Sequence, residues 1–206
     1  MKKLYCTLAL SFVALSGFGQ GSILFQNTAG VGLEKYVWGI DPRAPYSYVL
    51  GGPRDNCAGS GYSAELFIGT AGTSEADLKA IDASLTTFKT GTHAGLLNGN
   101  SKLVVQGRLG GTKVTLQLRT WDNKGGTVLT WDAAVADPNV ARGKSLLVLN
   151  YGLSGVDANN ALRVPAANLA AAGLHSFGLY IIPEPSVIAI SVLGLGALLL
   201  QRRARH

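Results

Sequence analysis

Residues that most often carry chemistry are scarce in this chain. Its 206 residues include two cysteines, three histidines and one methionine. Cys6 lies in an N-terminal apolar run that we expect to be removed, so Cys57 would remain without an intramolecular disulfide partner. His206 lies in a C-terminal tail, and the other histidines, His93 and His175, are too few for a three-histidine metal site. The sequence therefore predicts no disulfide, no metal and no cofactor, and a stability that comes from a buried core.

Recognisable catalytic motifs are also missing. The chain has no Gly-x-Ser-x-Gly, His-Glu-x-x-His or Cys-x-x-Cys pattern and no calcium-binding loop. We therefore assign no catalytic residue. A glycoside hydrolase needs only two facing carboxylates, however, and the spacing selects no pair among the candidates Glu34, Asp41, Asp55, Glu65 and Asp132.

An excess of positive charge is lacking from the central part of the chain. The formal net charge is +6, but two of the 18 basic residues precede Gly19 and three follow Glu184. The remaining 13 basic residues face 11 or 12 acidic ones, depending on which product of processing carries Glu184. Because no basic run occurs between the two ends, we expect no nucleic-acid binding.

Long apolar runs stand at both ends of the chain. Near the N-terminus, Lys2 and Lys3 precede an apolar run over 4–15, and small residues follow up to Gly19. A basic start, an apolar middle and a small-residue end are typical of a secretory signal peptide. The pattern predicts a signal peptide over 1–19, with cleavage after Gly19.

The C-terminal run has sharper borders. Residues 186–200 carry no charge, and at the helical rise they span roughly 22 Å, which is short for a bilayer core of about 30 Å. Three arginines follow and predict a short transmembrane helix with this end in the cytoplasm; they are Arg202, Arg203 and Arg205. Immediately before the run stand Pro183, Glu184 and Pro185.

These three blocks, in this order and behind a signal peptide, resemble the PEP-CTERM sorting signal of Gram-negative bacteria. The resemblance implies that Pro183, Glu184 and Pro185 are recognised by an exosortase-type membrane transpeptidase, which removes or exchanges the tail. It also implies a precursor anchored in the inner membrane and a product at the cell surface or in the extracellular matrix, in bacteria that make exopolysaccharide. Short segments near 59–69 and 174–182 resemble small exported PEP-CTERM proteins of unassigned function.

The sequence of residues 20–182 predicts a mainly β ectodomain, which we expect to be a β-sandwich of jelly-roll or immunoglobulin-like type. In the segment 113–121, apolar Val114, Leu116 and Leu118 alternate with polar residues, which predicts a half-buried strand. Turn-forming residues 122–126 follow, so that 127–131 is predicted to complete a hairpin. Further strands are expected at Ser22–Gln26, Tyr36–Ile40, Tyr62–Ile68, Leu103–Gln106, Ser145–Asn150 and Leu174–Ile182.

One helix is expected, at Glu75–Leu85. Ser74 and Asp77 fit a capping box, and an apolar stripe follows at Leu78, Ile81 and Leu85. A shorter helical turn is expected after Pro165, ending at Gly173. The segment 41–61 is too long for a hairpin connection and is interpreted as an excursion from the sandwich.

The tryptophans allow two interpretations, as packed core residues or as a sugar-stacking platform. The platform would use Trp121, Trp131 and Trp38, with Tyr46 and Tyr48 as further candidates. The sequence thus favours a non-enzymatic exported envelope or matrix protein. The alternatives are an exopolysaccharide-binding module, if the aromatic residues converge on one exposed face, and a hydrolase, if two carboxylates meet in a cleft.

Overall fold

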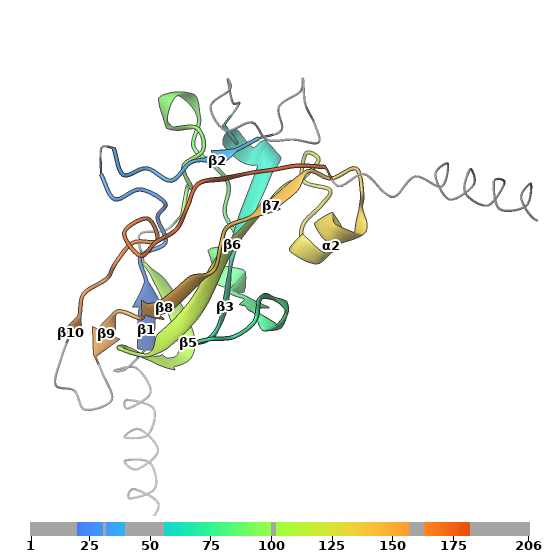
Figure 1. The fold of residues 1–206 in the computed structure, drawn as a ribbon. Coiled ribbons are helices and arrows are strands. Elements are labelled where there is room, and N and C mark those ends of the chain that lie inside the picture. Colours follow the sequence, from blue (N-terminus) through green and yellow to red (C-terminus); the bar gives the residue numbers. More distant parts are fainter. Residues whose placement is uncertain (1–19, 31, 40–55, 100–101, 157–162, 182–206) are drawn as a thin grey trace, which may run out of the picture.

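The computed structural model describes residues 20–30, 32–39, 56–99, 102–156 and 163–181 (Figure 1). In this part of the chain the fold is mainly β with one short α-helix, α2 (Trp131–Ala136), and this level of the prediction is confirmed. The strands are β1 (Gln20–Ile23), β2 (Val37–Trp38), β3 (Tyr62–Thr70), β4 (Lys79–Ala80), β5 (Leu103–Leu109), β6 (Lys113–Asp122), β7 (Arg142–Lys144), β8 (Val148–Gly152), β9 (Gly155–Val156), β10 (Arg163–Val164) and β11 (Phe177–Gly178). Short 3-10 turns are η1 (Gly59–Gly61), η2 (Glu75–Asp77), η3 (Asp82–Ser84) and η4 (Gly91–His93).

The largest sheet is built around β6. Its five strands follow the order β4-β3-β6-β7, and β8 pairs with the same edge of β6 as β7 does, further along the strand. β3 and β6 are antiparallel over their whole length, from the Tyr62–Asp122 pair to the Thr70–Val114 pair. In Figure 1 these two strands run through the middle of the molecule, with α2 near one end and β9 and β10 at the other.

Smaller pairings close the fold around this sheet. β1 pairs with β5, and β9 with β10, in antiparallel fashion, whereas β11 runs parallel to β2. A backbone bridge between Arg142 and Tyr180 joins β7 to the segment that follows β11. The last described segment is thus attached to two different parts of the domain.

The hydrophobic core lies against one face of β6. Val114, Leu116 and Leu118 are fully buried there and belong to one cluster with side chains from the rest of the domain, including Ile23, Phe25, Val37, Cys57, Leu66, Phe88, Leu153, Leu169, Leu174 and Leu179. The strand prediction for 113–121 is confirmed, but the expectation that it is half-buried is wrong.

The second face of β6 is covered too. Thr115 accepts a hydrogen bond from the Gly72 amide, and the Gln117 side chain donates to the Ser145 carbonyl. Thr115 and Gln117 are at most 1% exposed. These two polar positions of the alternating pattern are therefore buried with hydrogen-bond partners, and the pattern could not reveal the segments that supply them.

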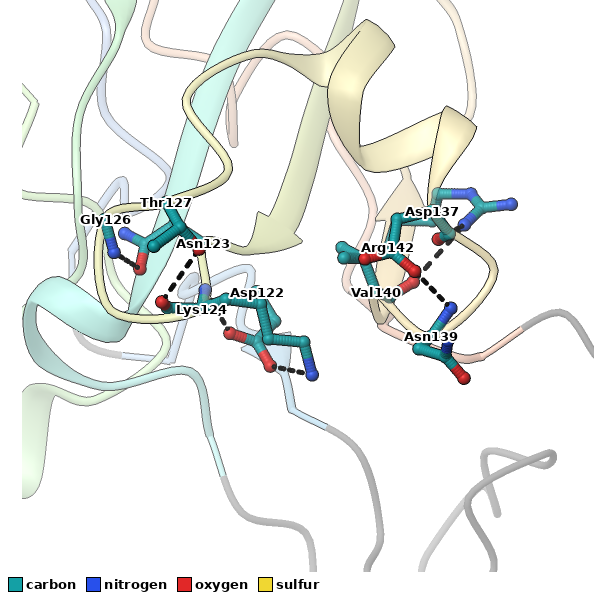
Figure 2. Close-up of polar contacts among 9 residues, drawn as sticks. All are labelled: Asp122, Asn123, Lys124, Gly126, Thr127, Asp137, Asn139, Val140 and Arg142. Atoms are coloured by element: carbon teal, nitrogen blue, oxygen red, sulfur yellow. Dashed lines mark hydrogen bonds and ion pairs between the residues drawn. The ribbon is translucent and has the colours of Figure 1, made fainter.

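The predicted hairpin over 127–131 is wrong. After β6 the chain turns tightly, with the Asn123 carbonyl accepting the amides of Gly126, Thr127 and Val128. Figure 2 shows side-chain contacts of this turn, in which the Gly126 amide donates to Asn123 Oδ1 and the Thr127 hydroxyl to the Lys124 carbonyl. The Thr130 hydroxyl then accepts the Ala133 amide at 3.2 Å and caps α2. A capping threonine before an alanine-rich segment favours a helix over a returning strand.

The predicted helix over Glu75–Leu85 is also wrong. Ser74 and Asp77 bond to each other through their side chains at 2.6 Å, and no side-chain cap forms. The chain instead pairs with β3, where the Ile81 amide donates to the Leu66 carbonyl and the Leu66 amide to the Ser84 hydroxyl. Pairing with a long buried strand outweighs a helical propensity that this short segment could not have sustained alone.

The other strand predictions vary in accuracy. Those in β1, β3 and β5 overlap the observed strands, and Ser145–Asn150 is displaced toward β8. Among the described residues of Tyr36–Ile40 only β2 is a strand, and among those of Leu174–Ile182 only β11. After Pro165, a hydrogen-bonded turn over 169–173 ends at Gly173, whose φ of +98° suits glycine.

Several predictions fall outside the described residues. These are the signal peptide over 1–19, the transmembrane helix and the sorting signal over 183–206, and most of the 41–61 excursion. Within the ranges that are described, no helix combines the length and the apolar character required for a membrane span.

Candidate functional site

The two tryptophans near the end of β6 occupy different environments. Trp121 is completely buried, its indole Nε1 donates to the Val128 carbonyl at 2.9 Å, and its ring meets that of Trp131 edge-on at 6.3 Å. The sugar-stacking interpretation is therefore wrong for Trp121, which is a packed residue. Trp131, the first residue of α2, is only half-buried.

Trp131 lies between two hollows on the surface. It lines both of them together with Arg119, which comes from β6. We call the first the acidic hollow; it has a volume of about 400 Å³ and its other lining residues include Glu65, Phe67, Lys79, Asp82 and Asp132. We call the second the basic hollow; it has a volume of about 240 Å³ and its other lining residues are Glu75, Val135, Arg142, Gly143, Lys144 and Tyr180.

The shared guanidinium of Arg119 is held in one position. It lies 3.9 Å above the centre of the Phe67 ring and 5.4 Å from that of Trp131. Its Nε donates to the Gln117 side chain at 2.8 Å, and Nη2 donates to the Glu75 carbonyl at 3.0 Å. Burial lowers the pKa of Arg119, and the negative charges of Glu75, Asp132 and Glu65 oppose that effect. Stacking between rings and two directed hydrogen bonds make this arginine a rigid wall for both hollows.

Glu65 supplies a carboxylate to the acidic hollow. It stands directly opposite Arg119 on the neighbouring strand β3, and the residue is 9% exposed. Within the described part of the chain its carboxylate has neither a hydrogen bond nor an ion pair. Burial raises the pKa of Glu65, the charges of Asp82 and Asp132 raise it further, and Arg119 partly offsets the shift. The acidic hollow thus contains a carboxylate whose hydrogen-bonding capacity is unused.

In the basic hollow, Lys144 and Arg142 differ in how their charges are matched. Lys144 forms a short ion pair with Glu75. Burial tends to raise the pKa of Glu75, but hydrogen bonds from Lys144 and Gln117 and the charges of Lys144 and Arg119 outweigh it, so this pKa is lowered. Arg142 has no ion pair in the described part of the chain.

Arg142 instead holds the loop that follows α2 (Figure 2). Its Nη1 donates to the carbonyls of Ala134, Asp137 and Val140 at 3.0, 3.1 and 3.3 Å. The residue is 9% exposed. Backbone carbonyls at a helix C-terminus favour a positive charge but leave it formally unneutralised.

Comparisons with family models, curated proteins and solved structures find no match for this chain.

Some of the residues that the sequence indicated lie together in the site. Of the five carboxylates considered for a hydrolase, Glu65 and Asp132 line the same hollow, and Asp82 joins them. Glu34 forms a backbone bridge with Thr28 away from the site, whereas Asp41 and Asp55 are outside the described residues. Trp38 is half-buried in β2 and lines neither hollow. Tyr46 and Tyr48 are likewise not described.

Sequence reasoning missed Arg119, Arg142 and Asp82. The half-buried strand expected over 113–121 would place Arg119 on its solvent-facing side, and the pairing of Glu65 with Arg119 follows from a strand register that no local pattern encodes. The alternation in β6 did indicate that Arg119 and Trp121 share a face with Gln117. This shared face points to a site only once it is known that other parts of the chain cover it.

The remaining titratable residues named from the sequence take no part in the site. Cys57 is buried in the core without a disulfide, and burial raises the pKa of its thiol far above the usual range. His93 and His175 are exposed. In the ranges that the structure covers, no three His, Cys, Asp or Glu side chains are placed to hold a metal ion.

Proposed function

We propose that this protein is a non-enzymatic exported envelope or extracellular-matrix protein of a Gram-negative bacterium, and that its ectodomain binds carbohydrate at the two hollows. The export part rests on the signal peptide pattern and on the PEP-CTERM-like blocks at 183–206. We further propose that the ectodomain belongs to the β-sandwich class. Its five-stranded sheet and its additional strand pairs support that assignment.

The carbohydrate proposal is carried by one observation, the half-buried Trp131 ring beside the Glu65 carboxylate, which has no partner among the described residues. A tryptophan face packs against the apolar C–H face of a sugar ring, and a carboxylate accepts hydrogen bonds from its hydroxyls. A few polar groups converging beside an aromatic wall are what a small-ligand site requires. Asp132 and Asp82 add acceptors to the same hollow.

Sorting is tested by replacing the acidic residue of the Pro-Glu-Pro block. The Glu184→Ala variant is expected to stay in the inner membrane with its tail uncut, and the Gln201→Ala variant serves as the control in the same segment. Cell fractionation and mass spectrometry of the C-terminus measure the outcome. Normal processing of Glu184→Ala would show that the block is not what the exosortase recognises.

Carbohydrate binding is tested with the Trp131→Ala variant of the full-length protein. Affinity electrophoresis against a panel of polysaccharides should show retardation of the wild type, and the variant should migrate freely. Leu129→Ala removes an exposed apolar side chain, 66% accessible, outside the hollows and is the matched control. Equal retardation of wild type and Trp131→Ala on every polysaccharide that binds would place binding elsewhere. Chain shortening of a bound polysaccharide would instead favour the hydrolase, with Glu65 and Asp132 as the pair to replace.

A further inference from the structure

We propose that the bound sugar is acidic, with its carboxylate in the basic hollow against Arg142 and its hydroxyls in the acidic hollow against Glu65. This inference rests on the proposed carbohydrate function and narrows its ligand to uronic-acid-containing glycans. The inference follows from two charged groups that have no ion-pair partner among the described residues, the Arg142 guanidinium in the basic hollow and the Glu65 carboxylate in the acidic hollow.

The guanidinium of Arg142 is only partly used by the described residues. Among these residues, only its Nη1 has partners, all of them backbone carbonyls, and the residue is 9% exposed in the wall of the basic hollow. Within the described residues, no carboxylate neutralises it. A buried cation is costly when no anion accompanies it. A carboxylate entering the hollow would provide that anion and would accept hydrogen bonds from the unused guanidinium nitrogens.

The two hollows differ in the charges that line them. The basic hollow has three cations, Arg119, Arg142 and Lys144, and a single carboxylate, Glu75, which is already paired with Lys144. The acidic hollow has three carboxylates and only Arg119 and Lys79 as cations. An anionic group is therefore favoured in one hollow and repelled by the other.

The acidic hollow suits neutral hydrogen-bond donors. Its carboxylates are not placed to hold a metal ion, and that of Glu65 has no hydrogen-bond donor among the described residues. Sugar hydroxyls are neutral donors that satisfy a carboxylate without introducing a second charge. Trp131 and Arg119 line both hollows. A sugar ring stacked on Trp131 could therefore extend one substituent into each hollow.

A peptide C-terminus is the main competing ligand. Its terminal carboxylate could bind Arg142, but a single terminal carboxylate provides neither a ring for Trp131 nor several hydroxyls for Glu65, Asp82 and Asp132. The observations favour the acidic sugar, and the peptide is one outcome of the test below.

The test compares an acidic ligand with its uncharged methyl ester. Full-length protein is titrated by Trp fluorescence and calorimetry with a galacturonic-acid oligomer and with the same oligomer as its methyl ester. We expect the acid to bind about tenfold more tightly at low ionic strength, as a charge-assisted hydrogen bond replaces a neutral one. The preference should weaken as salt is added.

Variants assign the preference to its residues. Arg142→Gln should abolish it, and Arg108→Gln, on β5 and outside both hollows, should leave it intact. Because Arg142 also holds the loop after α2, Lys144→Gln provides an independent measurement, with an expected two- to threefold reduction in affinity for the acid only. Its side chain is 44% exposed, so the fold should tolerate this change.

Each result decides the inference. Equal affinity for acid and ester overturns the acidic-sugar assignment while leaving the carbohydrate proposal in place. Failure of both forms to bind overturns the acidic-sugar inference, and the carbohydrate proposal falls with it if the polysaccharide panel also fails. A short peptide could instead bind more tightly than the oligomer, in a way that depends on Trp131 and that is lost in its C-terminal amide. That result would assign the site to peptide C-termini and overturn the acidic-sugar inference. If Arg142→Gln does not fold, the ester comparison and Lys144→Gln still separate these outcomes.

Discussion

Trp121 provides the most direct test of how the end of β6 is packed. It is fully buried, its Nε1 bonds to the Val128 carbonyl, and its ring contacts Trp131 edge-on. Removing a buried tryptophan side chain costs about 3–5 kcal/mol, which includes about 1 kcal/mol for the hydrogen bond and a similar amount for the ring pair. For a domain of this size each kcal/mol lowers the melting temperature by about 2–4 °C. Trp121→Ala should therefore melt roughly 6–20 °C below the wild type.

Two companion variants make the measurement specific. Trp121→Phe keeps most of the buried ring but loses the hydrogen bond, so a loss of about 1–2 kcal/mol is expected. Trp131→Ala removes a half-buried ring and should cost less than Trp121→Ala, since part of that ring already contacts water. Circular dichroism melts and urea titrations measure all three. A larger loss for Trp131→Ala than for Trp121→Ala would refute the assignment of Trp121 as the packed residue and Trp131 as the accessible one.

Three further predictions concern Glu65, Gly143 and Cys57. Glu65→Gln should raise the free energy of unfolding at pH 7. Because the pKa of Glu65 is raised in the folded state, the wild type loses stability as the pH rises from about 4.3, the unfolded value, through the higher folded value. Glutamine does not titrate, so the gain should vanish in melts below about pH 4. Gly143→Ala should cost at least about 1–3 kcal/mol, because a Cβ there would lie 2.3 Å from the Gly178 carbonyl oxygen, whereas Gly61→Ala, with open space, should be nearly neutral in urea titrations. Cys57 should react with a thiol reagent only as fast as the domain unfolds, and a rapid reaction in native buffer would contradict its burial.

The sequence allowed the mainly β fold to be predicted because its two longest strands have strong local signals. The alternation of apolar residues in β6 and the apolar run in β3 locate both strands to within about two residues. Short pairs such as β2 with β11 have no such signal. They form because the surrounding core brings two residues of each segment into register.

The errors have a common physical origin in tertiary context. The segment 75–85 has a helical pattern, but its residues 79–81 pair with β3 instead. The segment 127–131 has strand-like residues, but Thr130 finds the Ala133 amide and begins a helix. The candidate site depends on the same context, since Glu65 and Arg119 become neighbours only through the register of two strands that are more than forty residues apart in the chain.

The attachment of the segment after β11 has a mechanical consequence. The amide of Tyr180 donates to the Arg142 carbonyl, the Arg142 amide donates to the Tyr180 carbonyl, and the Leu179 amide donates to the Trp38 carbonyl. If the chain beyond this point is anchored, tension on the anchor enters the domain through these bonds and is shared between β2 and β7. A pull would then act on the backbone of Arg142 itself, so that the tether and the basic hollow are under the same load and ligand affinity can respond to force.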